Sequence, residues 1–201
     1  MMCEQPIKLV YVDDRIDAIL SRYLDEFSSQ QVDLNLNYQE VPFSKEDTYE
    51  ELLRNELVRT ANILLIDSRL FEEADAGKEK FTGEEFRIIL SRMFPYIEVV
   101  VISQNALDVS WSCVEKCKGN RNYAQAKVHY DGKLKATLEE KVKIIRETRM
   151  LIARLENREN IDRALVEKIR NLADGTDEYD ELKVSDIDRL VQAFNDLVSK
   201  G

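Results

Sequence analysis

Four side chains suited to a binding or reaction site follow predicted strands at the point where each strand ends. Asp13 and Asp14 follow the first apolar run of the chain. Asp67 follows the third such run, and Ser103 follows the fourth. Because the carboxyl ends of parallel strands converge on one crevice, where ligands bind, we expect these side chains to meet. The sequence therefore predicts a compact site with three carboxylates and a hydroxyl.

Three carboxylates in one crevice repel one another unless a cation lies between them. An all-oxygen set of few protein ligands, with room for water, suits Mg²⁺, so we expect this cofactor. With the ion in place, one carboxylate can act as a nucleophile toward a phosphoryl group. A hydroxyl and an ammonium that face it would bind the phosphoryl oxygens, which carry most of the charge. The residue types therefore indicate phosphoryl transfer.

The first half of the chain alternates short strand-like runs with amphipathic stretches, which is typical of a doubly wound α/β fold. Two runs are continuously aliphatic and predict central strands that are buried on both faces. Another run alternates strictly between apolar and polar residues, which favours a strand at the sheet edge. We expect a five-stranded parallel sheet, with strands at residues 7–12, 32–38 (the edge strand), 62–66, 98–102 and 123–130.

Amphipathic helices are predicted between the strands and beyond the last of them. Those within the first part of the chain are expected at residues 16–27, 46–60, 83–94 and 106–118. From Leu134 the pattern is purely helical. It predicts a long helix over 134–156 and two shorter ones over 161–172 and 184–198. We therefore divide the chain into an α/β domain, residues 1–133, and an all-helical extension, residues 134–201.

The long helix carries an apolar stripe that is close to a heptad repeat and is interrupted by Arg149. Such a stripe could join two copies of the chain as a homodimer through residues 134–156. It could instead pack against the two shorter helices, and the interruption at Arg149 favours this or a short coiled coil. Both possibilities stay open.

Composition argues against two kinds of partner. The formal net charge of -10 opposes sequence-independent binding of nucleic acid, and residues 184–198 hold three aspartates against one arginine. We therefore expect no DNA binding. No apolar run approaches the roughly 20 residues that span a bilayer, so we expect no membrane partner. The three cysteines are too few for a disulfide scaffold, which suits a reducing compartment and predicts a cytoplasmic protein.

Four segments of this sequence resemble the receiver domains of bacterial two-component response regulators, over about residues 7–145. They are VYVDDR (10–15), ILLIDSR (63–69), GEEF (83–86) and EVVVISQ (98–104). The resemblance implies a receiver-like, flavodoxin-like α/β fold for the first domain. It also implies that a histidine kinase or phosphotransfer protein supplies the phosphoryl group, and that a downstream protein responds to it.

The resemblance also implies a role for each residue of the site. Asp67 is the expected phosphoacceptor, and Asp13 and Asp14 are the acidic pair, with Asp14 the direct Mg²⁺ ligand. Arg69 is expected to give its backbone carbonyl to the metal, which makes the metal set Asp13, Asp14, Asp67 and Arg69. Ser103 is the expected switch hydroxyl and Tyr130 the switch aromatic. As an alternative, Asp13, Asp14 and Ser103 could cap the helices that follow them.

The chain departs from the family at the phosphate-binding lysine, because the family has proline after it and no Lys-Pro pair occurs here. Lys133 has Tyr130 three positions before it and leads into the long helix, whereas Lys127 is closer to Ser103 along the chain. We expect Lys133 to bind the phosphoryl group, with Lys127 as the alternative. The connection that includes residues 72–82 is also longer than in the family and predicts an insertion beside the site.

Three functional hypotheses follow. In the first, phosphorylation of Asp67 changes the packing or the partner binding of the helical extension. In the second, the domain is a degenerate receiver that acts as an interaction adaptor without phosphorylation. The third is a Mg²⁺-dependent phosphatase with Asp67 as transient nucleophile, but the position two residues later holds Arg69 instead of an acid. We therefore expect a phosphoacceptor and no turnover enzyme.

Overall fold

A five-stranded sheet forms the centre of the computed structural model, which describes residues 5–30, 35–44, 46–71, 82–104, 113–118, 122–157 and 162–176. All pairings between neighbouring strands are parallel, and the order is β2-β1-β3-β4-β5. The strands are β1 (Ile7–Asp13), β2 (Leu36–Pro42), β3 (Ile63–Asp67), β4 (Glu98–Ser103) and β5 (Cys113–Glu115). This order is that of the flavodoxin-like doubly wound fold, so the predicted fold class is confirmed.

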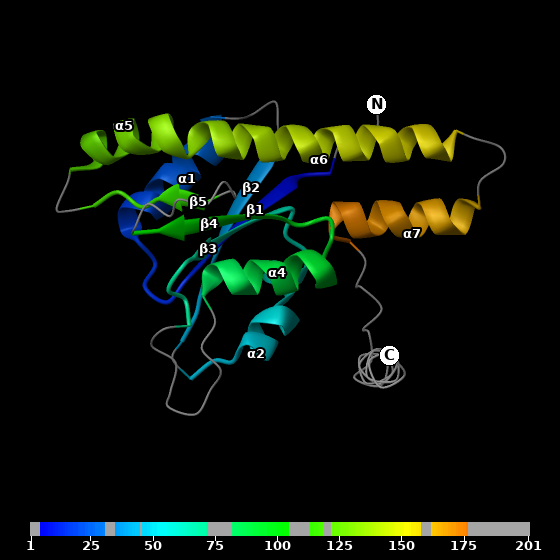
Figure 1. Ribbon diagram of the computed structural model, residues 1–201. Helices are drawn as coiled ribbons and strands as arrows, with labels where there is room; N and C mark the ends of the chain where they lie inside the picture. The colour runs from blue at the N-terminus through cyan, green and yellow to red at the C-terminus, as the bar shows by residue number, and fades with distance from the viewer. Residues whose placement is uncertain are drawn as a thin grey trace, which may run out of the picture.

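Helices cover both faces of the sheet (Figure 1). One face packs against α1 (Ala18–Gln30), α5 (Tyr123–Lys133) and the first half of α6 (Lys135–Glu156). The other packs against α2 (Tyr49–Arg54), α3 (Glu56–Arg59) and α4 (Gly83–Met93), and α7 (Arg163–Asp174) follows α6. Alternate residues of the central strands point into the two cores, Leu65 into the first and Leu64 into the second. Burial on both faces explains the continuous aliphatic runs.

Two elements differ in extent from their predictions. The strand predicted at the sheet edge is there, but β2 begins at Leu36, and residues 31–34 lie outside the described part of the chain. The single helix predicted over 46–60 is two helices, α2 and α3. Asn55 between them has extended backbone, and its side chain accepts hydrogen bonds from the N–H groups of Leu57 and Val58. It thereby caps a new helix.

The prediction for the fifth strand was wrong. Residues 123–130 lie in helix α5, whereas β5 falls inside the helix predicted over 106–118, of which residues 106–112 are not described. β5 has only three residues, and Val114 is the buried one. It is a strand because it pairs with β4, with Val114 opposite Ile102. That pairing is a tertiary contact, and three residues are too few to carry a recognisable alternation.

A helical signal upstream of residue 134 could have prevented this error. Ala126, Tyr130, Leu134 and Leu138 recur every four residues, and all four are fully buried in one core. A spacing of four is that of one helix face, so the stripe assigned to the long helix begins at Ala126. The strand then has to precede that helix.

Helices α6 and α7 lie side by side (Figure 1). The first half of α6 belongs to the core of the sheet, and its second half packs against α7 through Ile152 and Val166. The long helix predicted over 134–156 is confirmed, and α7 corresponds to the one predicted over 161–172. The helix predicted over 184–198 lies outside the described residues. Of the helices that the structure describes, none is long and apolar enough to cross a membrane.

The end of α7 is anchored at the amino edge of the sheet, chiefly by Arg149 of α6. The Arg149 guanidinium donates to the carbonyl oxygens of the two residues before β1, at 2.7 and 3.3 Å. Its Nε also lies 2.8 Å from Oδ1 of Asp174, the last residue of α7. Asn62, just before β3, donates from Nδ2 to the carbonyl of Ala173 at 3.0 Å. These contacts explain why a charged residue interrupts the apolar stripe of α6.

Candidate functional site

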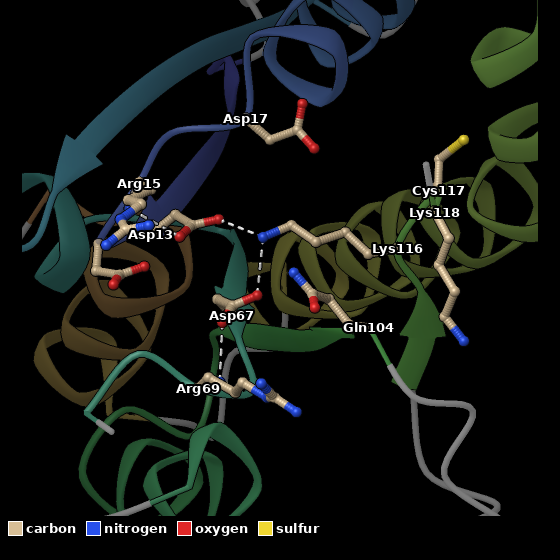
Figure 2. Close-up of a pocket in the computed structure, with 10 residues that line it drawn as sticks. Asp13, Arg15, Asp17, Asp67, Arg69, Gln104, Lys116, Cys117 and Lys118 are labelled. Atoms are coloured by element: carbon tan, nitrogen blue, oxygen red, sulfur yellow. Dashed lines mark hydrogen bonds and ion pairs between the residues drawn. The ribbon is translucent and has the colours of Figure 1, made fainter. Parts of the chain in front are cut away.

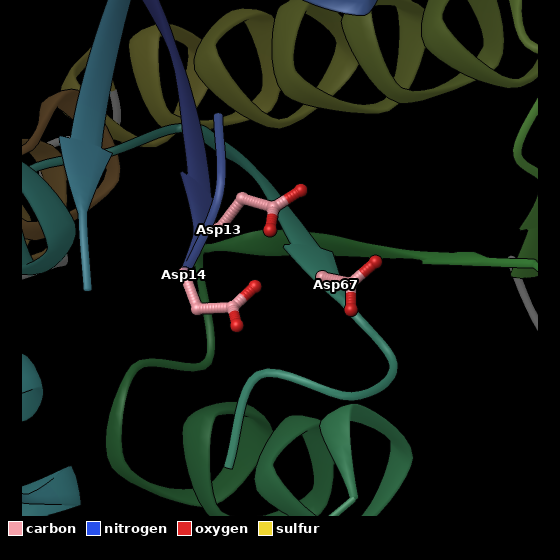
Figure 3. Close-up of side chains that lie close together, drawn as sticks. All are labelled: Asp13, Asp14 and Asp67. Atoms are coloured by element: carbon pink, nitrogen blue, oxygen red, sulfur yellow. The ribbon is translucent and has the colours of Figure 1, made fainter. Parts of the chain in front are cut away.

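Three carboxylates meet at the carboxyl edge of the sheet, where the sequence placed them (Figure 3). Asp13 ends β1, Asp14 follows it, and Asp67 ends the neighbouring strand β3. One carboxylate oxygen from each lies within 4.8 Å of the other two. Asp13 and Asp67 are buried and Asp14 is half-buried. Carboxylates this close in a partly desolvated site require positive charge between or beside them.

Part of that charge comes from Lys116, the residue that follows β5 (Figure 2). Its Nζ donates to Oδ2 of Asp13 at 2.7 Å and to Oδ1 of Asp67 at 2.9 Å. Lys116 is only 8% exposed. It therefore bridges two of the three carboxylates and places its ammonium against the expected phosphoacceptor.

Lys116 lies beside the carboxylates, at the position where the sequence analysis expected the phosphate-binding lysine, Lys133 or Lys127. Lys133 is exposed at the end of α5, and Lys127 pairs with Glu26 of α1, with 3.1 Å between Nζ and Oε2. Neither lines the cavity that contains the carboxylates. The preference for Lys133 was based on Tyr130 before it and the long helix after it, and both lie on the helical side of the sheet instead of at the carboxylates. A residue just after β5 is delivered to the same edge as the aspartates.

Asp13 and Lys116 stabilise each other's charged form. Burial acts to raise the pKa of Asp13, but hydrogen bonds from Lys116, Tyr11 and the Arg15 backbone bring that pKa below its ordinary value. Burial likewise acts to lower the pKa of Lys116, but its hydrogen bond to Asp13 and the charge of Asp67 raise that pKa above its usual range. Both groups are therefore ionised near neutral pH.

Tyr11 is a site residue that sequence reasoning missed. It is fully buried on β1 and donates its phenolic O–H to Oδ2 of Asp13, while Oδ1 of Asp13 accepts the N–H of Arg15 at 3.0 Å. Burial, and then the charge of Asp13, raise the pKa of Tyr11 far above its ordinary value, so the phenol remains a donor. Residues two apart on a strand share a face, and this periodicity could have linked Tyr11 to Asp13.

The start of α4 fixes the backbone around Asp67. Oδ2 of Asp67 accepts the N–H of Arg69 at 2.9 Å, and the N–H of Gly83 donates to the carbonyl of Ser68 at 2.8 Å. A Cβ at Gly83 would lie 2.5 Å from the carbonyl oxygen of Asp67, so only glycine fits. The Ser68 hydroxyl donates to the Glu84 carboxylate, whose oxygens are 2.8 and 2.9 Å away. The first two residues of GEEF thus hold the strand end in place.

Ser103 and Tyr130, the two expected switch residues, lie in different settings. Ser103 is buried at the end of β4, next to β3, and its carbonyl accepts the N–H of Lys116 at 2.7 Å. Tyr130 was expected at the end of a strand. It lies instead on helix α5, where it is fully buried. Its hydroxyl accepts the N–H of Cys117 at 3.2 Å, and burial raises the pKa of Tyr130 to about 12. Tyr130 therefore contacts the segment that carries Lys116.

Asp17 caps the start of α1, which is the alternative role considered for Asp13 and Asp14. Its Oδ1 accepts the N–H groups of Ile19 at 2.9 Å and Leu20 at 3.3 Å, at the start of α1. Asp13 uses its oxygens for Tyr11, Lys116 and the Arg15 backbone instead.

A cavity of about 630 Å³ lies over the cluster. It is lined by four acids, four bases, an amide and a thiol: Asp13, Asp14, Asp17, Asp67, Arg15, Arg69, Lys116, Lys118, Gln104 and Cys117. The three clustered carboxylates and the Lys116 ammonium carry a formal charge of −2. A hard divalent cation with oxygen ligands would balance that charge, and the donor set fits Mg²⁺.

No family model and no curated protein match this sequence. Among solved structures, the chain is similar to two-component response regulators. A two component transcriptional regulator AraC from Clostridium phytofermentans shares 15% identity over 70% of this chain and 95% of its own, with a TM-score of 0.42. RcsB of Salmonella typhimurium shares 14% over 92% and 99%, with a TM-score of 0.37. Sequence identities and TM-scores this low do not assign a fold or a function, so the fold class is assigned from the strand order of the sheet.

Another neighbour is an RcsB–DNA complex, with 14% identity over 87% of this chain and 94% of that chain, and a TM-score of 0.42. The expectation that the present chain does not bind DNA therefore gains no support from its neighbours. That expectation stays a prediction from the acidic composition.

Proposed function

We propose that this chain is a response-regulator-like signalling protein whose α/β domain accepts a phosphoryl group on Asp67 in a Mg²⁺-dependent way. The position of Lys116 carries the proposal, because its Nζ lies 2.9 Å from Oδ1 of Asp67 and 2.7 Å from Oδ2 of Asp13. Asp14 adds a third carboxylate. Charged groups gathered in a cavity with perturbed pKa values are typical of a functional site.

In the proposed reaction, a carboxylate oxygen of Asp67 attacks the phosphorus of a phosphohistidine or of a small acyl phosphate. An O–P bond forms while the bond from phosphorus to the leaving group breaks, and the leaving group keeps the electron pair. A leaving imidazole takes a proton from solvent, whereas the carboxylate that leaves an acyl phosphate stays ionised. Mg²⁺, when bound, neutralises the carboxylates and the phosphoryl oxygens. Asp13, Asp14 and Asp67 would hold it, together with the backbone carbonyl of Arg69 that the receiver resemblance implies.

Lys116 has a part before and after the transfer. Before it, the ammonium holds Oδ1 of Asp67 in a defined direction. After it, the negative charge lies on the phosphoryl oxygens, and a charge-assisted hydrogen bond from Lys116 can follow it there. Ser103 ends the next strand, β4, and is the proposed donor to a second phosphoryl oxygen.

The helical extension is the proposed output. Tyr130 of α5 accepts the N–H of the residue after Lys116, and only Leu134 separates α5 from α6, which runs on in line with it (Figure 1). A displacement of Lys116 would act on these helices and change their packing or the partner that they bind. The proposed partners are a histidine kinase or phosphotransfer protein and a downstream protein in the cytoplasm. A homodimer through residues 134–156 stays a prediction.

The two other hypotheses have less support. The degenerate-receiver adaptor was motivated by the missing Lys-Pro pair and by the long connection that includes residues 72–82. The contact between Lys116 and Asp67 weakens the first motive, although Cys117 and not proline follows this lysine. A phosphatase would need an acid near Asp67 to protonate the leaving group, and Arg69 occupies the position two residues on. We therefore propose a stoichiometric phosphoacceptor.

The test is incubation of the full chain with Mg²⁺ and acetyl phosphate, followed by measurement of the intact mass. The wild type should gain the mass of one phosphoryl group, and Asp67→Asn should gain none. Lys116→Met should gain far less than the wild type, because the ammonium that faces Asp67 is lost. Lys133→Met is the matched control and should behave as the wild type.

A wild-type protein that keeps its unmodified mass would contradict phosphoacceptance and favour the adaptor. Equal losses in Lys116→Met and Lys133→Met would contradict the assignment of the lysine.

A further inference from the structure

Two adjacent residues of α5 hold the backbone on either side of Lys116. The carbonyl of Glu115 accepts a hydrogen bond from Nε2 of His129 at 2.8 Å, and since a carbonyl cannot donate, Nε2 carries the proton. The N–H of Cys117 donates to the hydroxyl of Tyr130 at 3.2 Å. We call these two hydrogen bonds the Lys116 clamp.

The clamp addresses a positional problem at Lys116. A lysine side chain is a flexible stem of four methylene groups, and it loses much rotamer entropy when it is held in one place. In the family that the sequence resembles, a proline after the lysine restricts the backbone, but here Cys117 follows. β5 itself has only three residues, and beyond it the Lys116 N–H bonds to the carbonyl of Ser103 at 2.7 Å.

Helix α5 can act as a rigid support for the clamp. Tyr130 is fully buried, and its ring lies 5.2 Å from the ring of Tyr23 on α1, centroid to centroid. The Tyr23 hydroxyl in turn donates to Oδ1 of Asp131 at 3.1 Å. His129 packs edge-on against Tyr130, with 5.3 Å between the ring centroids. A donor or acceptor supported by buried rings is held in place more firmly than one on a loop.

We propose that His129 and Tyr130 are positioning residues for phosphoryl transfer, which act by holding the backbone of residues 115 and 117 so that the Lys116 ammonium faces Asp67. This inference rests on the proposed function, and it adds a specific device to it. The two side chains touch neither Asp67 nor the other carboxylates in any hydrogen bond described above. Their effect on the reaction therefore passes through Lys116.

The first experiment measures Lys116 directly, without phosphorylation. An amine-reactive ester labels exposed lysines, and peptide mass spectrometry gives the labelling rate of each. Tyr130→Phe and His129→Leu should each raise the rate at Lys116 several-fold. Lys141 is a matched internal control, because it is also 8% exposed and pairs with Glu98 at 3.1 Å. Its rate should not change.

Tyr38→Phe is the matched control variant. Tyr38 packs against the same core, but its hydroxyl donates to Glu40 at 2.8 Å and not to α5 or the Lys116 segment, so the Lys116 rate should stay that of the wild type. An unchanged Lys116 rate in both clamp variants would overturn the proposal. So would equal increases at Lys116 and Lys141, which would indicate general loosening of the fold.

The second experiment measures phosphorylation by acetyl phosphate at saturating Mg²⁺. The two clamp variants should react about tenfold more slowly than the wild type, since small misplacements of catalytic groups have effects of this size or larger. Mg²⁺ affinity should not fall, because the three carboxylates remain. His129→Gln keeps an N–H donor and should recover much of the rate lost in His129→Leu. Parallel losses of rate and Mg²⁺ affinity, without rescue by glutamine, would overturn a positioning role.

The two experiments separate failure of the clamp from failure of the proposed function. A wild type that takes up no phosphoryl group, but whose Lys116 is exposed by the clamp variants, would refute the phosphoacceptor and support the clamp. A wild type that is phosphorylated normally, with unchanged Lys116 labelling in the clamp variants, would support the phosphoacceptor and refute the clamp.

Discussion

Charged side chains are arranged differently at the two edges of the sheet. At the carboxyl edge, Asp13 and Asp67 share the Lys116 ammonium, Asp14 lies beside them, and a cavity of about 630 Å³ lies over the three carboxylates. At the amino edge, Arg149 and Asp174 pair one to one at 2.8 Å. The space beside that pair, between α6, α7 and the start of β4, is about 50 Å³.

The difference separates charges that pair within the chain from charges that we propose bind a cation. Removing one member of a closed pair destabilises the fold, because its partner is left buried without a counter-charge. A carboxylate cluster with excess negative charge reduces stability until a cation binds. Changes at the amino edge should therefore affect unfolding alone, and changes at the carboxyl edge should affect ligand binding most.

The largest effect on stability is expected from Gly175→Ala at the amino edge. Gly175 has a φ of +64°, and a Cβ there would lie 2.3 Å from the carbonyl oxygen of Thr60. Strain and overlap together should lower the free energy of unfolding by roughly 4 kcal/mol, as measured in urea. Gly132→Ala on α5 is the control, since a Cβ there meets nothing within 4 Å. It should raise stability by about 0.5–1 kcal/mol.

Arg149→Met should lower the free energy of unfolding by about 3 kcal/mol, because it leaves Asp174 and two backbone carbonyls without their buried partner. Arg154→Met, on the exposed side of α6, should change it by less than about 0.5 kcal/mol. If the two edges are independent, Arg149→Met will leave the stabilisation by Mg²⁺ intact. Loss of that stabilisation would break the comparison.

Mg²⁺ should stabilise the chain through the carboxyl edge. At a concentration one hundred times its dissociation constant, a ligand that binds only the folded state adds about 2.7 kcal/mol. Thermal unfolding with and without Mg²⁺ measures the gain, and Asp14→Asn should abolish it. Asp174→Asn at the amino edge should keep the full gain on a lower baseline. Equal gains in Asp14→Asn and wild type would place the ion elsewhere.

The smallest effect concerns pH. The pKa of Asp13 is lowered in the folded state, so its contribution is complete above the ordinary value of about 3.9 and is lost as pH falls through the lowered pKa. The pKa of Lys116 is raised, so its contribution is complete below about 10.4 and is lost as pH rises through the raised pKa.

The stability difference between wild type and Lys116→Met should therefore be constant from about pH 5 to 9 and shrink on either side. Unfolding in urea across this range measures it. A difference that varies steeply near neutral pH would show that the pair between Lys116 and Asp13 is not the one described.

The sequence by itself determined the four longer strands of the sheet and the meeting of the carboxylates. Long aliphatic runs identify β3 and β4 without ambiguity, and parallel strands must end at a common edge. Asp13, Asp14 and Asp67 were therefore found because each ends, or directly follows, a strand that can be read locally. The long helix α6 was found for the same reason, since its stripe repeats over many turns.

Tertiary structure alone decided the fifth strand, and with it the lysine. β5 is three residues long and is a strand only through its pairing with β4, a contact between distant segments that local periodicity cannot report. That pairing brings Lys116 to the carboxylates. It also places the residues on either side of Lys116 within reach of His129 and Tyr130 on α5. Arg149 looked like an interruption of a stripe, and only the docking of α7 shows what it binds.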